Sequence, residues 1–161
     1  MKTLLYKYLC GKCSTSFKSP GISGEIYGEF LLRSEKASEV AYLNAFKDSF
    51  FEEVGKIFDE VVKHKSIGNF VCSDIFQSIF SESCDLAEDG TKYRIDLQPL
   101  CPNCGSRKMS SWGPVKPVEY IAEDIKGVSH KHWATLTYGE KKLLVENAVT
   151  TYLAGRNDAI E

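Results

Sequence analysis

Short runs of apolar residues in the first third of the chain predict two β-hairpins. Residues 4–9 and 14–18 flank the short segment Cys10–Cys13 and read as the two arms of the first hairpin. Residues 26–33 and 39–46 are β-like and are separated by five residues, a length typical of a hairpin connection. The last of these runs is also compatible with the start of a helix.

Apolar residues recur at helical spacing from Ser49 to His64. Ser49 is followed three residues later by Glu52, which fits a capping box and predicts that the helix begins there. The apolar residues at this spacing are Phe50, Val54, Ile57, Phe58, Val61 and Val62, and the acids are Glu52, Glu53, Asp59 and Glu60. Because the acids fall mainly on the other side, we expect an amphipathic helix with an acidic face.

Two further helices are predicted. A short one, capped by Ser73 or Asp74, carries the apolar residues Ile75, Phe76, Ile79 and Phe80. A longer one begins at Thr137, where Glu140 completes a second capping box, and Gly155 is its stop signal. Its apolar stripe consists of Leu143, Leu144, Ala148, Val149 and Tyr152. We expect this stripe to dock on the core.

The region between these helices has strand character. Asp89 and Gly90 predict a turn, and the alternation over residues 93–97 predicts a strand that leads into a second cysteine pair. Residues 109–112 would form the returning arm of that unit. The mixed run 118–125 does not settle on helix or strand.

Composition indicates a soluble globular protein. Of the 161 residues, 43% are apolar and 26% are charged, which is ordinary for one compact domain. No stretch approaches the roughly 18 apolar residues of a membrane span. Lys7 interrupts the first apolar run and no small-residue cleavage site follows, so we interpret this run as a strand and not a signal peptide. We expect a cytoplasmic protein with no membrane association.

Charge is segregated along the chain although the net charge is only −2. Residues 1–20 carry four bases and no acid, and residues 99–117 carry three bases and no acid. Residues 21–90 carry fourteen acids and six bases. The two cysteine-containing ends are therefore basic, and the long segment between them is acidic.

Six cysteines are present, and four of them form two C-x-x-C pairs, Cys10 with Cys13 and Cys101 with Cys104. Two such pairs supply the four thiolates that a structural zinc site needs. Iron bound by four cysteines would have the same pattern. A redox dithiol should follow a strand and open a helix, and neither pair does so. We therefore predict one structural metal ion, with zinc preferred over iron.

The second pair, Cys101-Pro102-Asn103-Cys104-Gly105 with Lys108 following, resembles the knuckles of zinc-ribbon and rubredoxin-like proteins. The first pair departs from that form at Ser14, where a glycine is common, and 87 residues separate Cys13 from Cys101. The resemblance covers residues 4–18 and 93–116. It implies rubredoxin-like β-hairpins that form a discontinuous zinc ribbon (1–20 and 91–117). The family does not explain the α/β insertion (21–90) or the C-terminal helical segment (118–161), and together these parts predict a single α+β domain.

Other chemically notable residues have simpler interpretations. Cys72 and Cys84 lie twelve residues apart among apolar neighbours, so we expect buried, inert thiols. His64 ends a predicted helix, where a positive charge suits the helix dipole. No motif places a carboxylate or a nucleophile near His130 or His132. Since phosphate-loop, hydrolase and H-E-x-x-H motifs are also absent from the sequence, we do not expect an enzyme.

Three functions fit these features. The first is a protein-interaction module that presents the acidic, aromatic-rich insertion to a basic protein partner. One form of it is an immunity or antitoxin-like protein that covers a toxin nuclease. The second is a nucleic-acid-binding ribbon that uses Lys2, Lys7, Lys12, Lys18, Arg107, Lys108 and Lys116, with Tyr6, Tyr8, Phe17 or Trp112 for stacking. The third is an iron-loaded electron carrier. The acidic insertion favours the first function, because it would repel phosphate over much of the surface.

Overall fold

A computed structural model describes the chain as two small sheets and a set of helices. The described residues are 3–22, 27–63, 65, 67, 69–95, 97–121 and 124–157, so Lys2, Ile26 and His64 lie outside them. The strands are β1 (Leu4–Cys10), β2 (Ser16–Gly21), β3 (Glu29–Ser34), β4 (Val40–Asn44), β5 (Tyr93–Arg94) and β6 (Met109–Pro114). The helices are α1 (Ser49–Val62), α2 (Asn69–Ile79), the 3₁₀ turn η1 (Phe80–Ser83), α3 (Lys131–Thr135) and α4 (Tyr138–Asn157).

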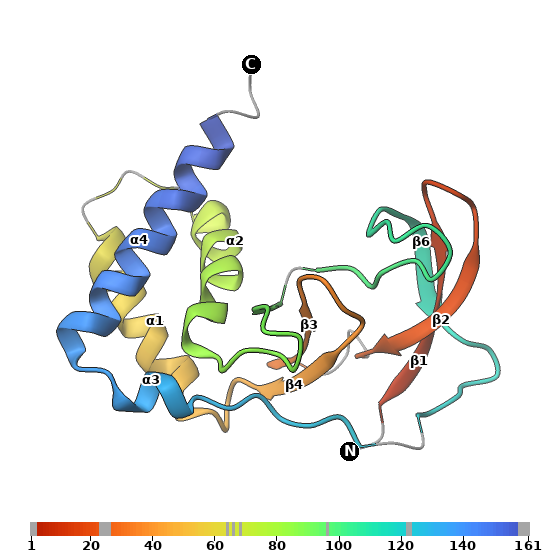
Figure 1. The fold of residues 1–161 in the computed structure, drawn as a ribbon, viewed down its shortest axis with the longest axis horizontal. Coiled ribbons are helices and arrows are strands. Elements are labelled where there is room, and N and C mark those ends of the chain that lie inside the picture. Colours follow the sequence, from red (N-terminus) through yellow and green to blue (C-terminus); the bar gives the residue numbers. More distant parts are fainter. Residues whose placement is uncertain are drawn as a thin grey trace.

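The α+β class is confirmed. One antiparallel sheet, here called the ribbon sheet, has the order β2-β1-β6, and a second, the insert sheet, has the order β4-β3-β5. The helices lie at one end of the molecule, the ribbon sheet lies at the other, and the insert sheet lies between them (Figure 1). Among the described residues, no helix is long and apolar enough to cross a membrane.

The ribbon sheet is built around β1. Its pairing with β2 confirms the first predicted hairpin, and the predicted returning arm forms β6, which occupies the other edge of β1. The strand predicted over 93–97 is wrong in extent and in place. Of the described residues in this run, Tyr93 and Arg94 pair, and their partner is β3 of the insert sheet.

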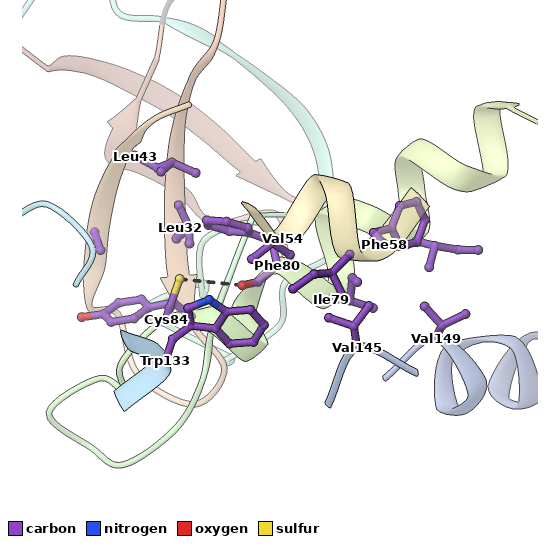
Figure 2. Close-up of a cluster of buried hydrophobic side chains, with 14 of the residues drawn as sticks. Leu32, Leu43, Val54, Phe58, Ile79, Phe80, Cys84, Trp133, Val145 and Val149 are labelled. Atoms are coloured by element: carbon purple, nitrogen blue, oxygen red, sulfur yellow. Dashed lines mark hydrogen bonds between the residues drawn. The ribbon is translucent and has the colours of Figure 1, made fainter. Parts of the chain in front are cut away.

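The second predicted hairpin is confirmed as β3 and β4, paired from Glu29 with Asn44 to Arg33 with Val40. Residues 39–46, which the sequence left as either a strand or the start of a helix, therefore contain a strand. One face of the insert sheet carries Leu32 and Leu43 into a core shared with the helices (Figure 2). The helices contribute Val54, Ile57 and Phe58 from α1, Ile75 and Ile79 from α2, Trp133 from α3, and Val145 and Val149 from α4.

The ribbon sheet does not share this core. Among the described residues, the buried cluster contains no side chain from β1, β2 or β6. The buried apolar side chains at the ribbon end are few: Tyr8, Cys10, Cys101 and Val115. Hydrophobic burial therefore stabilises the helical end far more than the ribbon end.

The starts of α1 and α2 differ from the predictions. The N-cap of α1 is Asp48 and not Ser49, because the Asp48 carboxylate accepts from the backbone N–H groups of Phe50 (2.9 Å) and Phe51 (3.0 Å). Helix α2 begins at Asn69, so the predicted caps Ser73 and Asp74 are wrong and lie inside the helix.

Helix α4 begins as predicted but ends later. The hydroxyl and the backbone N–H of Thr137 each donate to Glu140 Oε2 at 2.7 Å, which confirms the second capping box. The helix continues through Gly155, so the predicted stop is wrong. The predicted stripe docks on the core through Leu144, Ala148, Val149 and Tyr152. Leu143 is exposed instead, and Val145, which was not part of the predicted stripe, is fully buried.

The corrected cap of α1 can be tested. Replacing Asp48 with Ala should lower the free energy of unfolding by about 2 kcal/mol or more, since two backbone N–H groups lose their acceptor and the buried His130 ring loses its carboxylate partner. Ser49→Ala is the matched control and should change it by less than about 0.5 kcal/mol. Urea denaturation followed by circular dichroism measures both. Equal effects would mean that Asp48 is not the cap.

The two sheets are joined by a strap and by two arginines. The strap, residues 115–128, bonds to β1 through Leu5 N–H and Glu119 O (2.9 Å) and to β4 through Tyr42 N–H and Lys126 O (2.9 Å). The run 118–125 contained in this strap forms no helix, and apart from an isolated bridge at Tyr120 it forms no strand within its described residues.

Arg33 and Arg107 lie at the junction of the sheets. Arg33 Nη2 donates to the carbonyl of Pro20 in β2 at 2.6 Å. Arg107 donates through Nη1 to Gln98 O (2.5 Å) and through Nη2 to Ser34 O (2.6 Å). These bonds connect the second cysteine segment to β3, a role for Arg107 that the sequence pattern did not indicate.

Candidate metal centre

The first cysteine knuckle is the turn that joins β1 to β2. Cys10 ends β1, and its backbone N–H donates to Thr15 O at 2.9 Å while its carbonyl accepts from Ser14 N–H at 3.0 Å. Ser14 has a positive φ of 57°. This left-handed residue reverses the chain so that Cys10 and Cys13 lie on the same side of the turn.

The second knuckle repeats this hydrogen-bond pattern. Cys101 N–H donates to Ser106 O at 2.9 Å, and Cys101 O accepts from Gly105 N–H at 2.9 Å. Gly105 has φ +67° and corresponds in position to Ser14. The sequence departure at Ser14 therefore leaves the geometry of the knuckle unchanged, and its cost is backbone strain.

The four sulfur atoms face one another. All four lie within 4.8 Å of each other, with Cys10 Sγ 3.6 Å from Cys104 Sγ and Cys13 Sγ 3.6 Å from Cys101 Sγ. Zinc–sulfur bonds of about 2.3 Å in a tetrahedron place sulfurs about 3.8 Å apart. All four thiols are free. The donor set and its spacing therefore fit one tetrahedrally bound metal ion, and the predicted cysteines are the ones brought together.

The knuckles are held side by side by the backbone of the ribbon sheet. Gly11 N–H donates to Lys108 O at 2.7 Å, and the Ser110 hydroxyl donates to Leu9 O at 3.2 Å. The ladder between β1 and β6 shifts register at Leu9 and Cys10, a bulge that turns the end of β1 towards the second knuckle. The sheet thus pre-positions both pairs of sulfurs.

Hydrogen bonds at the site favour thiolates. The Thr15 hydroxyl, 3.2 Å from Cys13 Sγ, and the Thr15 backbone N–H lower the pKa of Cys13 to about 5. Backbone N–H groups, first that of Cys13 and then that of Lys12, hold the pKa of Cys10 below its usual range. At Cys104 the Ser106 N–H has the same effect, but burial and the neighbouring sulfurs outweigh it and raise the pKa to about 12. A bound cation would replace the protons that these sulfurs otherwise share.

Access to the sulfurs is uneven. Cys10 and Cys101, the first cysteine of each pair, are buried, whereas Cys13 and Cys104 are half-buried. Lys12 and Lys108 are at the protein surface near the knuckles, where their charges can offset those of thiolates. Arg107 points away from the sulfurs towards the carbonyls at the sheet junction.

The other two cysteines lie elsewhere. Cys84 is buried in the helical core, where its thiol faces Phe80 O at 3.9 Å (Figure 2). Burial raises the pKa of Cys84 to about 12, which confirms an inert thiol. Cys72 is only half-buried, so its predicted full burial is wrong.

His130 has a structural position that sequence reasoning missed. Its ring is buried, with Nδ1 2.6 Å from Ser83 O and Nε2 3.1 Å from Asp48 Oδ2. Both ring nitrogens thus lie within hydrogen-bond distance of an oxygen acceptor. His130 therefore links the cap of α1 to η1 and to the start of α3. His132 is exposed.

The matched knuckles give a reciprocal prediction. Ser14→Gly should raise the free energy of unfolding by up to about 1 kcal/mol, because glycine adopts a positive φ without steric cost. Gly105→Ser should lower it by about 1–2 kcal/mol for the opposite reason. Thermal unfolding of the metal-loaded protein measures both changes. Changes of the same sign would mean that the two positions are not equivalent.

No protein-family model, curated protein or solved structure matches this chain.

Proposed function

We propose that Cys10, Cys13, Cys101 and Cys104 bind one structural zinc ion, and that the chain is a protein-interaction module whose partner contacts the acidic insertion. The observation that carries this proposal is the closed set of four sulfurs. Four protein ligands leave no open coordination position for a substrate, which is the pattern of a structural site and not of a catalytic one.

The placement of the cysteines supports a structural role. Each knuckle comes from a different end of an intervening segment of 87 residues, so one ion would tie both ends of the insertion together. Zinc is preferred over iron because structural zinc is the commoner use of four thiolates in a ribbon-like unit. An iron-loaded electron carrier remains the third candidate, and its purified protein would be red.

Exposed aromatic side chains of the insertion support an interaction role, and ion pairs limit the acidic surface that a partner can contact. Tyr27 and Phe46 are 87% and 72% exposed, which is unusual for large aromatic side chains on a small protein. Many acids of the insertion are already paired, for example Glu53 with Lys141 at 2.8 Å and Glu82 with Lys92 at 2.5 Å. Fewer acidic side chains are therefore available to a partner than the fourteen acids of residues 21–90 suggest. An immunity or antitoxin-like protein that covers a toxin nuclease is one specific form of this proposal.

Nucleic-acid binding by the ribbon sheet is the second candidate. It is weakened because several of its residues have other partners: Lys18 pairs with Glu119 at 2.7 Å, and the rings of Tyr8 and Phe17 stack on each other at 5.7 Å. The residues that remain available to bind nucleic acid are exposed Trp112 and the exposed lysines Lys7, Lys12, Lys108 and Lys116.

The test has a metal arm and a ligand arm. Elemental analysis of the purified protein should give one zinc per chain and no iron, and the protein should be colourless. Titration with mixed single-stranded DNA and RNA at several salt concentrations should show weak binding. If the protein bound nucleic acid tightly and the affinity fell steeply with salt, the proposal of an interaction module would be wrong, and nucleic-acid binding by the ribbon sheet would be the better explanation.

A further inference from the structure

A groove opens between the β3–β4 hairpin, α1 and α2, with a volume of about 960 Å³. Five phenylalanines line it, and the rings of four of them, Phe30, Phe51, Phe58 and Phe76, contact each other in series. Phe30 stacks on Phe51 with centroids 6.2 Å apart, Phe51 meets Phe76 edge-on at 5.1 Å, and Phe76 contacts Phe58 at 5.5 Å. Because these rings also pack against the core cluster, the groove has a preformed apolar floor.

The rim of the groove bears the exposed pair Tyr27 and Phe46, whose rings are 5.6 Å apart. Gly28 follows Tyr27 with φ +81°, and a Cβ at this position would collide with the Phe46 ring. The tight turn at Gly28 therefore places both aromatic rings beside the floor, where they extend the apolar surface outwards.

The charged residues that line the groove are mainly acidic. They are Glu29, Glu52 and Asp59, with Lys56 as the single base. Lys56 pairs with Glu52 at 2.7 Å, but both side chains are more than two-thirds exposed, so this pair contributes little. Among the described residues, Asp59 has no ion-pair partner. An apolar floor is thus bordered by uncompensated negative charge.

Gly55 keeps the wall of the groove open. It lies in the middle of α1 and lines the groove, and a Cβ there would have no heavy atom within 4 Å. Glycine inside a helix costs about 1 kcal/mol relative to alanine, and no packing contact at this site requires it. The open space at Gly55 provides a position at which a side chain can fill the groove.

We propose that this groove binds a protein segment whose apolar side chains are flanked by lysine or arginine. The inference rests on the proposed function as an interaction module and names the surface and the partner's chemistry. Apolar side chains would fill the phenylalanine floor while the flanking cations meet Glu29, Glu52 and Asp59. A second copy of this chain is a poorer occupant, because its net charge is −2 and its own insertion is acidic.

The first test uses a 14-residue probe peptide with leucines at helical spacing and lysines elsewhere, and a counterpart in which every lysine is glutamate. The lysine peptide should bind the zinc-loaded protein and shift the amide resonances of residues lining the groove, and the glutamate peptide should not bind. Gly55→Trp should weaken binding at least about tenfold by filling the groove. Gly139→Trp is the matched control, because Gly139 is also helical and without neighbours within 4 Å, and its effect should stay below about twofold.

The second test separates the groove from general charge attraction. The double variant Glu52→Lys with Asp59→Lys should weaken binding at least about tenfold. Glu88→Lys with Glu146→Lys changes the net charge equally at exposed positions away from the groove, and should weaken binding less than about threefold. Equal losses in both pairs, no effect of Gly55→Trp, or no binding of the lysine peptide would overturn the groove proposal. A different result would contradict the proposed interaction module itself: tight binding of nucleic acid whose affinity falls steeply with salt.

Discussion

Removing the metal should unfold the ribbon sheet while the helical core stays folded. The buried cluster contains no described residue of β1, β2 or β6, so the ribbon sheet depends on its backbone ladder and on the cysteine centre. Isolated sheets of this size are marginally stable in water. The apparent binding free energy of a four-thiolate zinc site is on the order of 10 kcal/mol, which exceeds what the few buried side chains of the ribbon end can supply.

The two tryptophans report separately on the two ends of the molecule. Trp112 lies on β6 and is 57% exposed, whereas Trp133 lies on α3 and is 1% exposed. In a Trp133→Phe variant, a zinc chelator should change the Trp112 fluorescence, and amide exchange of β1 and β6 should become rapid. In a Trp112→Phe variant, the Trp133 fluorescence and the helical circular dichroism should change little.

Cys101→Ser should reproduce the effect of the chelator and abolish stoichiometric metal binding. Cys84→Ser is the matched control, because it makes the same substitution at a buried thiol of the helical core and should leave one metal per chain. If Cys101→Ser retained metal and stability, the four cysteines would not share an ion. If the chelator unfolded both ends together, the core would not be independent of the ribbon sheet.

The sequence predicted the cysteine centre because its signal is local. Each C-x-x-C pair fixes its own turn, and two such turns have few uses other than a shared metal ion. The flanking strands were also predictable, since the short runs 4–9 and 14–18 on either side of the first pair are a property of neighbouring residues. Ser14 shows the limit of such reasoning, because its left-handed conformation follows from hydrogen bonds that close the knuckle and not from its own preference.

What could not be predicted depends on contacts between distant segments. Strand β5 pairs with β3 of the insert sheet and not with the ribbon sheet, and alternation alone does not select a partner. Asp48, and not Ser49, caps α1. Its carboxylate also contacts His130, which is 82 residues further along the chain. The groove arises where α1, α2 and a hairpin meet, so Phe58 and Phe76, which the helical spacing marks as apolar, also form part of the floor of a surface groove.

Trp133→Ala should cause the largest loss of stability at the helical end, about 3–5 kcal/mol. The indole is 1% exposed, its N–H donates to Glu53 Oε2 at 2.8 Å, and the Lys141 ammonium lies 5.5 Å from the ring centroid. The substitution would leave a cavity between α1 and α4 and would deprive the Glu53 carboxylate of one of its two donors. Helix α3 has only five residues, so it has little intrinsic stability to compensate.

The measurement that decides this prediction compares both ends of the same variant. Urea denaturation by circular dichroism should show the helical transition of Trp133→Ala at a much lower denaturant concentration, while elemental analysis still gives one zinc per chain. Trp112→Ala, the same substitution at the exposed tryptophan, should cost less than about 1 kcal/mol. Loss of zinc from Trp133→Ala would show that the cysteine centre depends on the helical core. Retention of zinc by a protein whose helices have melted would show that the metal stabilises the ribbon end by itself, because the four thiolates and the β1–β6 ladder suffice to close it.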